Sequence, residues 1–371
     1  MKIAIIHDWL TGMRGGEKCL EVFCELFGDA TIFTLIHDKG SCSDTIEKMK
    51  IRPSFIQNLP NAIKGYRSYL PFFPKAIESF NLQGYDLILS SSHCAAKGVK
   101  VPKGAKHICY CYTPMRYAWV FFDEYFGHYN PVKKWLIHNV IERLKGWDIK
   151  TNESVDFFIA ISDNVRARIK KYYDRESDII YPPVDTSRFK VSAADEGFYL
   201  IVSALVPYKR IDLAIEAFNI SKKKLIIIGA GNSSSELKAK ADRNIKFLGW
   251  SDDKTIEDHY ARSSGLIFPG DEDFGIVPVE AQACGKPVIA YAKGGALETI
   301  VDLGSTQNNP TGVLFCEQTT EALNQAIERF ESNKDKFNPN AIRENAMRFD
   351  REEFKKKIRE YVEARTNGVL E

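Results

Sequence analysis

Two glutamates eight positions apart, Glu272 and Glu280, have the spacing in this chain that points most directly to chemistry. The apolar residues 265–269 predict a strand that ends in an acidic loop carrying Glu272. Pro278 favours the first turn of a following helix, because its missing N–H would be unpaired there, and this places Glu280 in that turn. Ligands bind at the carboxyl ends of strands in open α/β sheets, where helix N-termini offer N–H groups to anions. The pattern therefore predicts a site for a phosphorylated ligand that carries a sugar.

Two adjacent cations, Lys209 and Arg210, follow an expected strand at 199–204. The pair suits a diphosphate, and an arginine adds bidentate geometry. Because the helix dipole disfavours cations at a helix start, their position favours a function over ordinary surface charge. Asp271 and Asp273 form a D-x-D pattern, by which some sugar transferases hold a divalent metal. Since Lys209 and Arg210 can neutralise phosphate instead, we expect no metal site and no obligatory cofactor.

The first half of the chain offers further candidates. The glycine loop 12–16 precedes a helix and can bring backbone N–H groups close to a phosphate or an acceptor, with a structural turn as the alternative. His93 follows a strand and is a candidate acid, base or sugar contact, although a lone histidine in a loop is more often structural. Arg116 lies in the segment 112–129 among eight aromatic rings. A cation among aromatic rings is suited to binding the faces of sugars and lipid diphosphates, while core packing alone would explain most of the rings.

Length and composition predict a globular protein of two domains, since 371 residues exceed one ordinary core. No apolar run reaches the length of a membrane span, and the N-terminus passes directly into a strand, so we expect a cytoplasmic protein. The eight scattered cysteines predict free thiols. Residues 1–180 hold 25 Lys and Arg against 20 Asp and Glu. This excess of positive charge is consistent either with an approach to an anionic lipid surface or with an ordinary solvated surface. The apolar stretch 69–77 is either a membrane-surface contact or a loop braced over the core.

Apolar runs alternate with helical patterns, which predicts parallel sheets with crossover helices. A Pro-Pro pair near residue 180 marks a hinge, and Ser162 is a predicted N-cap of a helix over 164–173. The expected strands are residues 3–7, 31–36, 86–90, 107–111, 157–161, 199–204, 225–229, 245–248, 265–268 and 288–291. The expected helices are residues 17–27, 164–173, 210–220, 234–242, 253–263 and 278–284, with charged helices over 339–366.

The motif EDFGIVPVE at 272–280 resembles that of the retaining glycosyltransferases of family 4, with support from VPYKRIDLAIEAF, FLGWSDD and YPPVD. The segments GGEKCLEVF, SSSHCAAKG and CYTPMRYAW are similar to the branch of mannosyltransferases that build surface polysaccharides from GDP-mannose. The resemblance implies an α/β GT-B fold, with two Rossmann-like, doubly wound parallel-sheet domains facing a central cleft. Residues 1–180 would bind the acceptor and residues 181–349 the nucleotide-sugar donor, with a helix in 350–371 packing back on the first domain.

The same resemblance implies roles for the residues that match. Glu280 would hold the ribose hydroxyls, Lys209 would contact the donor diphosphate, and Glu272 would face the donor sugar. Arg210 joins Glu272 and Lys209 in the predicted catalytic set on grounds of charge. The remaining implied donor contacts are Phe274, Gly275, Ile276, Val277, Gly249, Gly15, Gly16 and Ser162.

Two positions depart from the pattern of these relatives. Many of them have an arginine where Ala204 stands, and relatives of this branch often have a histidine, usually a contact of the donor sugar, where Tyr112 stands. Tyr112 can replace a hydrogen bond but not a cation. Tyr112, Arg116 and His93 are the predicted contacts for the acceptor or the sugar.

The expected function is retaining transfer of a hexosyl group, mannosyl from GDP-mannose, to a hydroxyl of a glycan or lipid-linked acceptor. The expected partners are a nucleotide sugar, that acceptor and a peripheral membrane surface on the cytoplasmic face, and no nucleic acid. Two alternatives stay open. One is another GT-B enzyme, a sugar-nucleotide epimerase or a phosphorylase. The other is a non-catalytic nucleotide-sugar-binding subunit, which remains an alternative because Tyr112 and Ala204 differ from the residues of these relatives.

Overall fold

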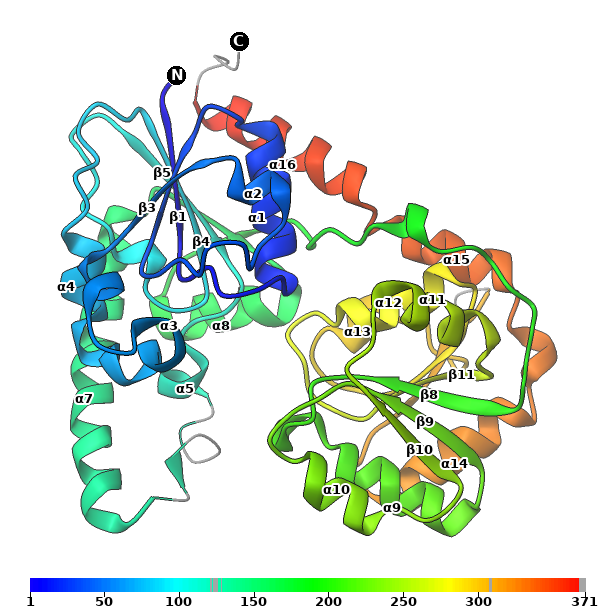
Figure 1. The fold of residues 1–371 in the computed structure, drawn as a ribbon. Coiled ribbons are helices and arrows are strands. Elements are labelled where there is room, and N and C mark those ends of the chain that lie inside the picture. The colour runs from blue at the N-terminus through cyan, green and yellow to red at the C-terminus, as the bar shows by residue number, and fades with distance from the viewer. Residues whose placement is uncertain (121, 123–125, 128, 307–308, 367–371) are drawn as a thin grey trace. The chain divides into compact units, whose positions relative to one another are not determined.

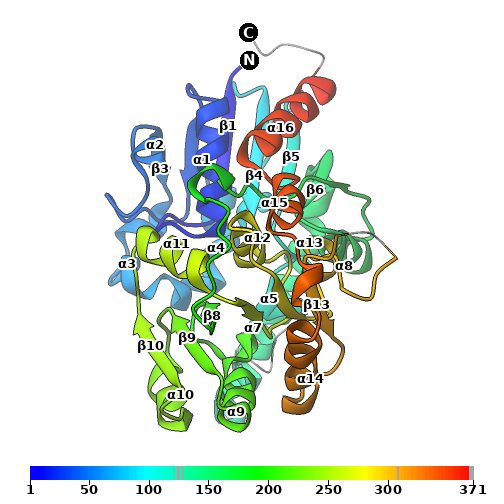
Figure 2. The same cartoon turned by 90° about the vertical axis from the view of Figure 1, so that its right-hand side faces the viewer.

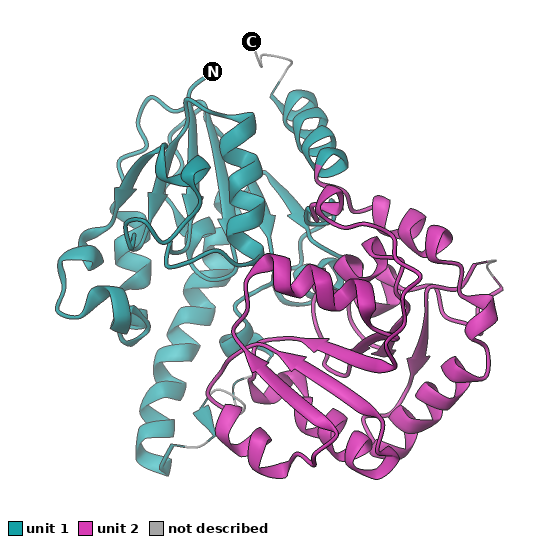
Figure 3. Cartoon of the chain, turned by 45° about the vertical axis from the view of Figure 1, so that its right-hand side comes forward, with its two compact units in different colours: residues 1–183, 352–371 teal, residues 184–351 magenta. Residues whose placement is uncertain are grey.

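The computed structural model describes residues 1–120, 122, 126–127, 129–306 and 309–366. The chain divides into two compact units (Figure 3). Unit 1 is Met1–Pro183 with Glu352–Glu371, and unit 2 is Val184–Arg351. Each unit is a parallel sheet covered by helices, which confirms the predicted α/β fold with two Rossmann-like domains.

Unit 1 holds a seven-stranded parallel sheet with the strand order β3-β2-β1-β4-β5-β6-β7. Its interior strand β1 is buried along its whole length, as expected where helices cover both faces of a parallel sheet. The order reverses between β1 and β4, so the loops after these two strands diverge and leave room for a ligand. The strands are β1 Ile3–His7, β2 Thr31–Thr34, β3 Lys50–Pro53, β4 Leu87–Ser92, β5 Lys106–Cys111, β6 Phe157–Ala160 and β7 Asp178–Ile179.

Helices of unit 1 come from both ends of the chain. The last helix, α16, packs on α1, with the rings of Phe23 and Phe354 centred 5.8 Å apart (Figures 1 and 2). The stretch 69–77 is helical, so the predicted loop is wrong; Phe73 and Ile77 are buried in the core, whereas Phe72 is exposed. The helices are α1 Gly15–Leu26, α2 Asp44–Glu47, α3 Ala62–Gly65, α4 Phe73–Glu78, α5 Arg116–Trp119, α7 Pro131–Lys150, α8 Asp163–Tyr173 and α16 Arg351–Arg365.

Unit 2 holds a six-stranded parallel sheet with the order β10-β9-β8-β11-β12-β13, which reverses between β8 and β11. The strands are β8 Phe198–Val202, β9 Lys224–Ile228, β10 Ile245–Gly249, β11 Gly265–Phe268, β12 Val288–Tyr291 and β13 Gly312–Phe315. The helices are α9 Ile211–Ser221, α10 Ser234–Lys240, α11 Asp253–Arg262, α12 Ile276–Ala283, α13 Ala296–Thr299, α14 Thr320–Glu331 and α15 Pro339–Met347.

The two ends of unit 2 meet. Val184 and Asp350 form an isolated parallel bridge. The Val184 N–H donates to the carbonyl of Phe349 at 2.9 Å, and the Arg351 N–H donates to the carbonyl of Val184 at 3.0 Å. Unit 2 therefore starts and finishes at one point of its own surface.

Most predicted elements are confirmed, and one helix start is corrected. The cap at Ser162 is confirmed, because its hydroxyl accepts the N–H of Val165 at 3.1 Å. The helix after β11 starts at Ile276 instead of near Pro278, because Gly275 takes a φ of +88° at the N-cap. Glu280 therefore lies in the second helical turn, and its placement in the first turn was wrong. Within the described part of the chain, every helix is too short or too polar to span a bilayer.

Candidate active site

In unit 2, glycine contacts fix the loop that carries Glu272, between β11 and α12. The Gly295 N–H donates to the carbonyl of Glu272 at 2.8 Å. A Cβ atom on Gly294 would lie 2.2 Å from that carbonyl oxygen, and one on Gly295 would lie 2.1 Å from the carbonyl oxygen of Phe274. Because only glycine permits so close an approach, the pair Gly294-Gly295 sets the position of the Glu272 backbone.

Glu272 forms an ion pair with Lys209, which follows β8. The two side chains are only 19% and 14% exposed, so water screens the pair less than it would on an open surface. The backbones also meet here, since a Cβ atom on Gly270 would lie 3.0 Å from the Cα of Lys209. The loops that follow β8 and β11 are thus joined at the reversal of strand order, where ligands bind in open α/β sheets. Two of the three predicted catalytic residues meet at this point.

Arg210, the third predicted catalytic residue, is directed to other partners. It takes a left-handed φ of +53° at the N-cap of α9. Its guanidinium lies 3.3 Å from Asp212 Oδ1 and 3.4 Å from Gln318 Oε1. The Gln318 amide in turn donates to the carbonyl of Pro269 at 2.8 Å, so Arg210 supports the Glu272 loop through Gln318. Its predicted contact with a diphosphate stays a prediction.

Glu280, on α12, is oriented by a buried tyrosine. The Tyr260 hydroxyl donates to Glu280 Oε2 at 3.1 Å. Burial, together with the charge of Glu280, raises the pKa of Tyr260 well above its usual range, so this hydroxyl stays a donor. A carboxylate held in this way can accept hydrogen bonds from vicinal hydroxyls, as the predicted ribose contact requires.

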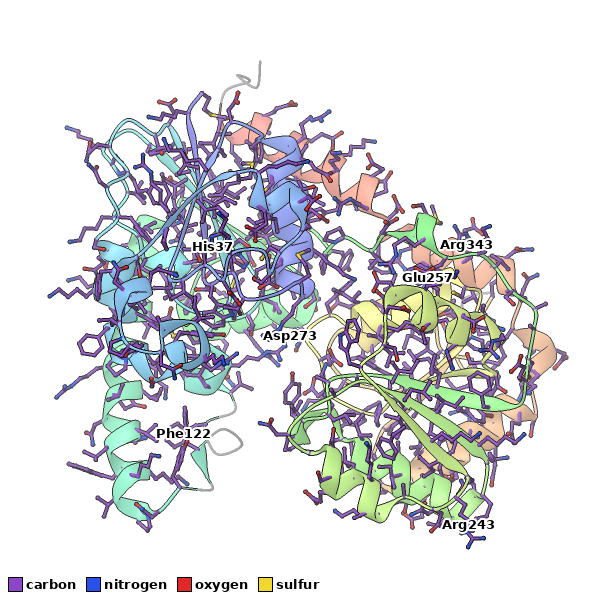
Figure 4. All side chains as sticks on the ribbon, viewed as in Figure 1. His37, Phe122, Arg243, Glu257, Asp273 and Arg343 are labelled. Atoms are coloured by element: carbon purple, nitrogen blue, oxygen red, sulfur yellow. The ribbon has the colours of Figure 1, made fainter. Side chains whose placement is uncertain are left out.

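The two aspartates of the D-x-D pattern have other surroundings. Asp271 pairs with Lys293 at 3.1 Å, and Asp273 is 4% exposed (Figure 4). Among the described residues, no group of three His, Cys, Asp or Glu side chains is placed to hold a metal ion. The predicted absence of an obligatory metal stays a prediction.

Gly249 belongs to a set of close backbone turns at the carboxyl ends of β8, β9 and β10. Its carbonyl accepts the N–H of Gly229 at 2.7 Å. A Cβ atom on Gly229 would lie 1.8 Å from the carbonyl oxygen of Ser203, and one on Gly231 would lie 2.2 Å from that of Leu205. The Gly-Ala-Gly segment is therefore a packing turn that joins the loops after neighbouring strands.

In unit 1, Tyr112 belongs to a hydrogen-bonded chain whose direction can be assigned. Its hydroxyl lies 2.9 Å from the carbonyl oxygen of Gly16 and 2.8 Å from Ser91 Oγ, which lies 2.9 Å from His7 Nδ1. A carbonyl only accepts, so Tyr112 donates to Gly16, Ser91 donates to Tyr112, and His7 Nδ1 carries the proton given to Ser91. Tyr112 thus holds the glycine loop, and the single proton of its hydroxyl is used within unit 1.

Sequence patterns did not predict the hydrogen bonds that link Tyr112, Ser91 and His7, or the position of Glu17 beside them. His7 Nε2 lies 3.7 Å from Glu17 Oε1, and Glu17 Oε2 accepts the Arg14 N–H at 3.0 Å. Burial by itself raises the pKa of Glu17, but the neighbouring His7 imidazole outweighs burial, and the pKa lies below its usual value. The available signal was a histidine at the end of β1 and a glutamate in the first turn of α1, which one short loop joins, whereas Ser91 lies beside His7 only because β1 and β4 are neighbours in the sheet.

His93 is held by Asp8, a fully buried carboxylate. Asp8 accepts the backbone N–H groups of residues 93–96 at 2.6–3.0 Å, and His93 Nδ1 lies 3.1 Å from Asp8 Oδ2. The His93 side chain is 33% exposed and meets the ring of Trp9 edge-on at 4.4 Å. His93 therefore has a fixed ring at the carboxyl edge of the sheet, as a sugar contact would need.

The remaining candidates of unit 1 differ in accessibility. Gly15 and Gly16 form the first turn of α1, and Arg116 is the first residue of α5 and half-buried. Ser162 is fully buried as a helix cap. Residues 121, 123–125 and 128 of the aromatic segment lie outside the described residues. The structure thus gathers Gly16 and Tyr112 with His7 and Ser91, and leaves Ser162 in a structural position.

Comparison with known proteins extends these observations. Residues 184–349 match the family model described as glycosyl transferases group 1. The alpha-1,3/1,6-mannosyltransferase ALG2 of Kluyveromyces lactis is 25% identical over a gapped alignment 432 positions long, which covers 96% of this chain and 83% of that protein. The O-antigen chain mannosyltransferase C of Escherichia coli is 24% identical, over 50% of this chain and 53% of that protein.

Solved structures share the fold over nearly the whole chain. A sucrose-phosphate synthase from Thermosynechococcus elongatus has a TM-score of 0.73 at 17% identity and covers 98% of this chain and 99% of its own. The Anabaena protein HepE in complex with UDP has a TM-score of 0.68 at 18% identity and covers 98% of this chain and 100% of its own. At these identities the likeness concerns the fold.

Proposed function

We propose that this chain, which has the GT-B fold and whose residues 184–349 match the model of the glycosyl transferases group 1 family, is a retaining mannosyltransferase. The donor is GDP-mannose, and the acceptor is a hydroxyl of a glycan or lipid-linked oligosaccharide. The choice of mannose is supported by the names of relatives such as the mannosyltransferases of Kluyveromyces lactis and Escherichia coli. A lipid-linked acceptor implies a peripheral contact with a membrane.

The ion pair between Lys209 and Glu272 is the observation that carries this proposal. It sets a cation and a carboxylate side by side at the strand-order reversal of unit 2, with Glu280 on the following helix. Lys209 meets the diphosphate of the donor, Glu272 faces the sugar, and Glu280 accepts from the ribose hydroxyls. When the donor binds, its phosphate shares Lys209 with Glu272, so the lysine is already placed where negative charge develops.

The proposed reaction exchanges one bond at the anomeric carbon of the sugar. The bond from that carbon to the phosphate oxygen breaks, and its electron pair leaves with the diphosphate. The acceptor oxygen bonds to the same carbon from the same face, and its proton moves to the departing phosphate oxygen. The residues that hold the diphosphate therefore stabilise the leaving group, which is where the transition state gains most. The N–H groups of Ile276 and Val277 at the start of α12 add to Lys209.

We propose that these groups neutralise the diphosphate without an obligatory metal. Asp271, the first aspartate of the D-x-D pattern, is engaged by Lys293, and Asp273 is buried. A test measures GDP-mannose turnover before and after exhaustive chelation. Turnover that falls with chelation and returns with a divalent cation would contradict this part of the proposal.

The central experiment compares donor binding with donor turnover. Thermal unfolding with GDP and with UDP tests the base, since a ligand at a hundred times its Kd stabilises the fold by about 2.7 kcal/mol. Glu272→Ala and Lys209→Ala should each lower GDP-mannose turnover by about 10²–10³-fold, as expected for lost transition-state contacts. The matched control is the exposed ion pair of α10, with Glu236→Ala and Lys240→Ala, which should retain wild-type turnover.

Each outcome is decisive. Wild-type turnover in both site variants would refute the assignment of the site. A shift in unfolding temperature with UDP and none with GDP would replace the proposed donor. Donor binding with no turnover across a range of acceptors would favour a non-catalytic nucleotide-sugar-binding subunit.

A further inference from the structure

The start of helix α7 carries three exposed apolar side chains. Val132, Trp135 and Leu136 are 71%, 64% and 54% exposed. Their spacing of three and four residues places them on one side of the helix, and we call them the α7 patch. The buried residues of α7 all lie beyond residue 140, and the first side chain of the helix to pack against the core of unit 1 is the partly buried Ile137.

The α7 patch is separate from the surface by which α7 packs on its own unit. In Figures 1 and 3 the first turns of α7 extend beyond the sheet of unit 1, while the later turns lie against it. His138 follows Leu136 by two residues on α7. Its ring meets the ring of Phe122, which is labelled in Figure 4, edge-on at 5.6 Å. A group of exposed apolar side chains of this kind marks a contact with a partner protein or a membrane.

The charges beside the α7 patch favour an anionic partner. Lys133 and Lys134 lie in the first helical turn, which contains no acidic residue. Over its length α7 carries five Lys and Arg against two acidic residues, and one of those two, Asp148, is fully buried.

We infer that the α7 patch, with Lys133 and Lys134, binds the surface of an anionic lipid bilayer. Trp135 suits the boundary between headgroups and acyl chains, where tryptophan is enriched, and lysines near such a surface are attracted to anionic lipids. Leu136 and Val132 supply apolar area beside the indole. The inference assigns the proposed membrane contact to one surface and one lipid class.

The test is sedimentation of the full chain with vesicles of phosphatidylcholine, with and without phosphatidylglycerol. We expect binding to the anionic vesicles that weakens as salt rises. The double variant Trp135→Ser/Leu136→Ser should bind at least about tenfold more weakly, because it removes two side chains that lose contact with water on insertion. Lys133→Gln/Lys134→Gln should lower binding about 25-fold, or roughly fivefold for each lysine.

The matched control is the double variant Ile220→Ser/Trp250→Ser in unit 2. Its two side chains are 66% and 80% exposed, so it removes a comparable exposed apolar surface. It should bind anionic vesicles like the wild type. All the substituted side chains are exposed except that of Lys134, which is partly buried, and equal thermal unfolding midpoints will show that the variants fold.

The inference is overturned if the wild-type chain stays in solution with both kinds of vesicle. It is also overturned if the Trp135→Ser/Leu136→Ser variant binds like the wild type, or if the control loses as much binding. A wild-type dimer that becomes a monomer in the patch variant, with no vesicle binding, would identify a self-association surface instead. The assay needs neither donor nor acceptor, so its failure is distinguishable from a failure of the proposed mannosyl transfer.

Discussion

Replacing Asp8 by asparagine tests whether one buried carboxylate holds the His93 loop. Asp8 follows β1 and is fully buried, and each of its two oxygens accepts two backbone N–H groups from residues 93–96. Asparagine has the same shape but offers one oxygen and one NH₂ group. Two backbone N–H groups therefore lose their acceptor and face a donor.

The expected loss of stability follows from that count. A buried donor without a partner costs about 1–3 kcal/mol, so two of them predict that Asp8→Asn lowers the free energy of unfolding by about 2–6 kcal/mol. The pKa of Asp8 gives a separate estimate. Burial alone would raise this pKa, but the charge and hydrogen bonds of His93 outweigh burial and lower it from 3.8 to about 2. A shift of that size corresponds to about 2 kcal/mol in favour of the folded state.

The sign of the pH dependence follows from the lowered pKa. The contribution of Asp8 is fully present above pH 4 to 5, and it is lost as the pH falls through the folded-state pKa of about 2. The wild-type chain should therefore approach the Asp8→Asn variant in stability as the solution is acidified. At neutral pH the gap between them should be at its widest.

Hydrogen exchange at the amides of residues 93–96, with urea unfolding as a global measure, provides the assay. We expect faster exchange at these amides in Asp8→Asn at pH 7. Asp252→Asn is the matched control, because Asp252 is the N-cap of α11 and asparagine caps a helix equally well. A stability within about 0.5 kcal/mol of wild type for Asp8→Asn, with unchanged exchange, would refute the reasoning.

Two further substitutions test the contact of the Gly294-Gly295 pair with the Glu272 loop and the hydrogen bonds of Tyr112. Gly295→Ala places a Cβ atom 2.1 Å from the carbonyl oxygen of Phe274, so the loop must move, and GDP-mannose turnover should fall at least about tenfold. Tyr112→Phe removes the hydroxyl that donates to the carbonyl of Gly16 and accepts from Ser91. It should lower the free energy of unfolding by about 1–3 kcal/mol, measured by thermal unfolding.

Each of these substitutions has a control in the same unit. Gly304 in unit 2 is exposed, and a Cβ atom there would approach only side-chain atoms, with Asp302 Oδ2 at 2.9 Å, so Gly304→Ala should leave turnover unchanged. Tyr69→Phe in unit 1 removes only a surface hydrogen bond to Pro60 and should cost less than Tyr112→Phe. Wild-type turnover in Gly295→Ala would show that the loop tolerates displacement, and equal losses in the two tyrosine variants would contradict the assigned chain.

Local patterns were sufficient for most elements of the fold. An apolar run followed by Ser162 specifies a strand and then a capped helix, because capping depends only on residues within one turn. The strands β3 and β13 were not predicted from the sequence. The four residues of β13 are too few for a periodic signal. The edge strand β3 (Lys50–Pro53) is polar and ends in proline, as edge strands often are.

The sequence was enough to propose residues for the candidate site, but it did not indicate their contacts. Glu272 and Glu280 are close in the chain, so their spacing was informative. The ion pair of Glu272 with Lys209 joins residues far apart in the chain, and it depends on β8 and β11 being neighbours in the sheet. The partners of Tyr112 likewise come from α1 and β4, so its residue type indicated a hydrogen bond and gave no direction for it.

The closed ends of unit 2 bear on how such enzymes diversify. Because Val184 is hydrogen-bonded to both Phe349 and Arg351, a gene segment for 184–351 encodes a body whose entry and exit coincide. A domain whose two ends are adjacent can be inserted into another protein, or circularly permuted, without distorting the surrounding structure. Unit 1 is the opposite case, since truncation after residue 183 would remove Phe354 from its contacts with Phe23 and Tyr110. Recombination within this fold is thus expected to respect the boundaries of unit 2 and to keep the final helix with the first half of the chain.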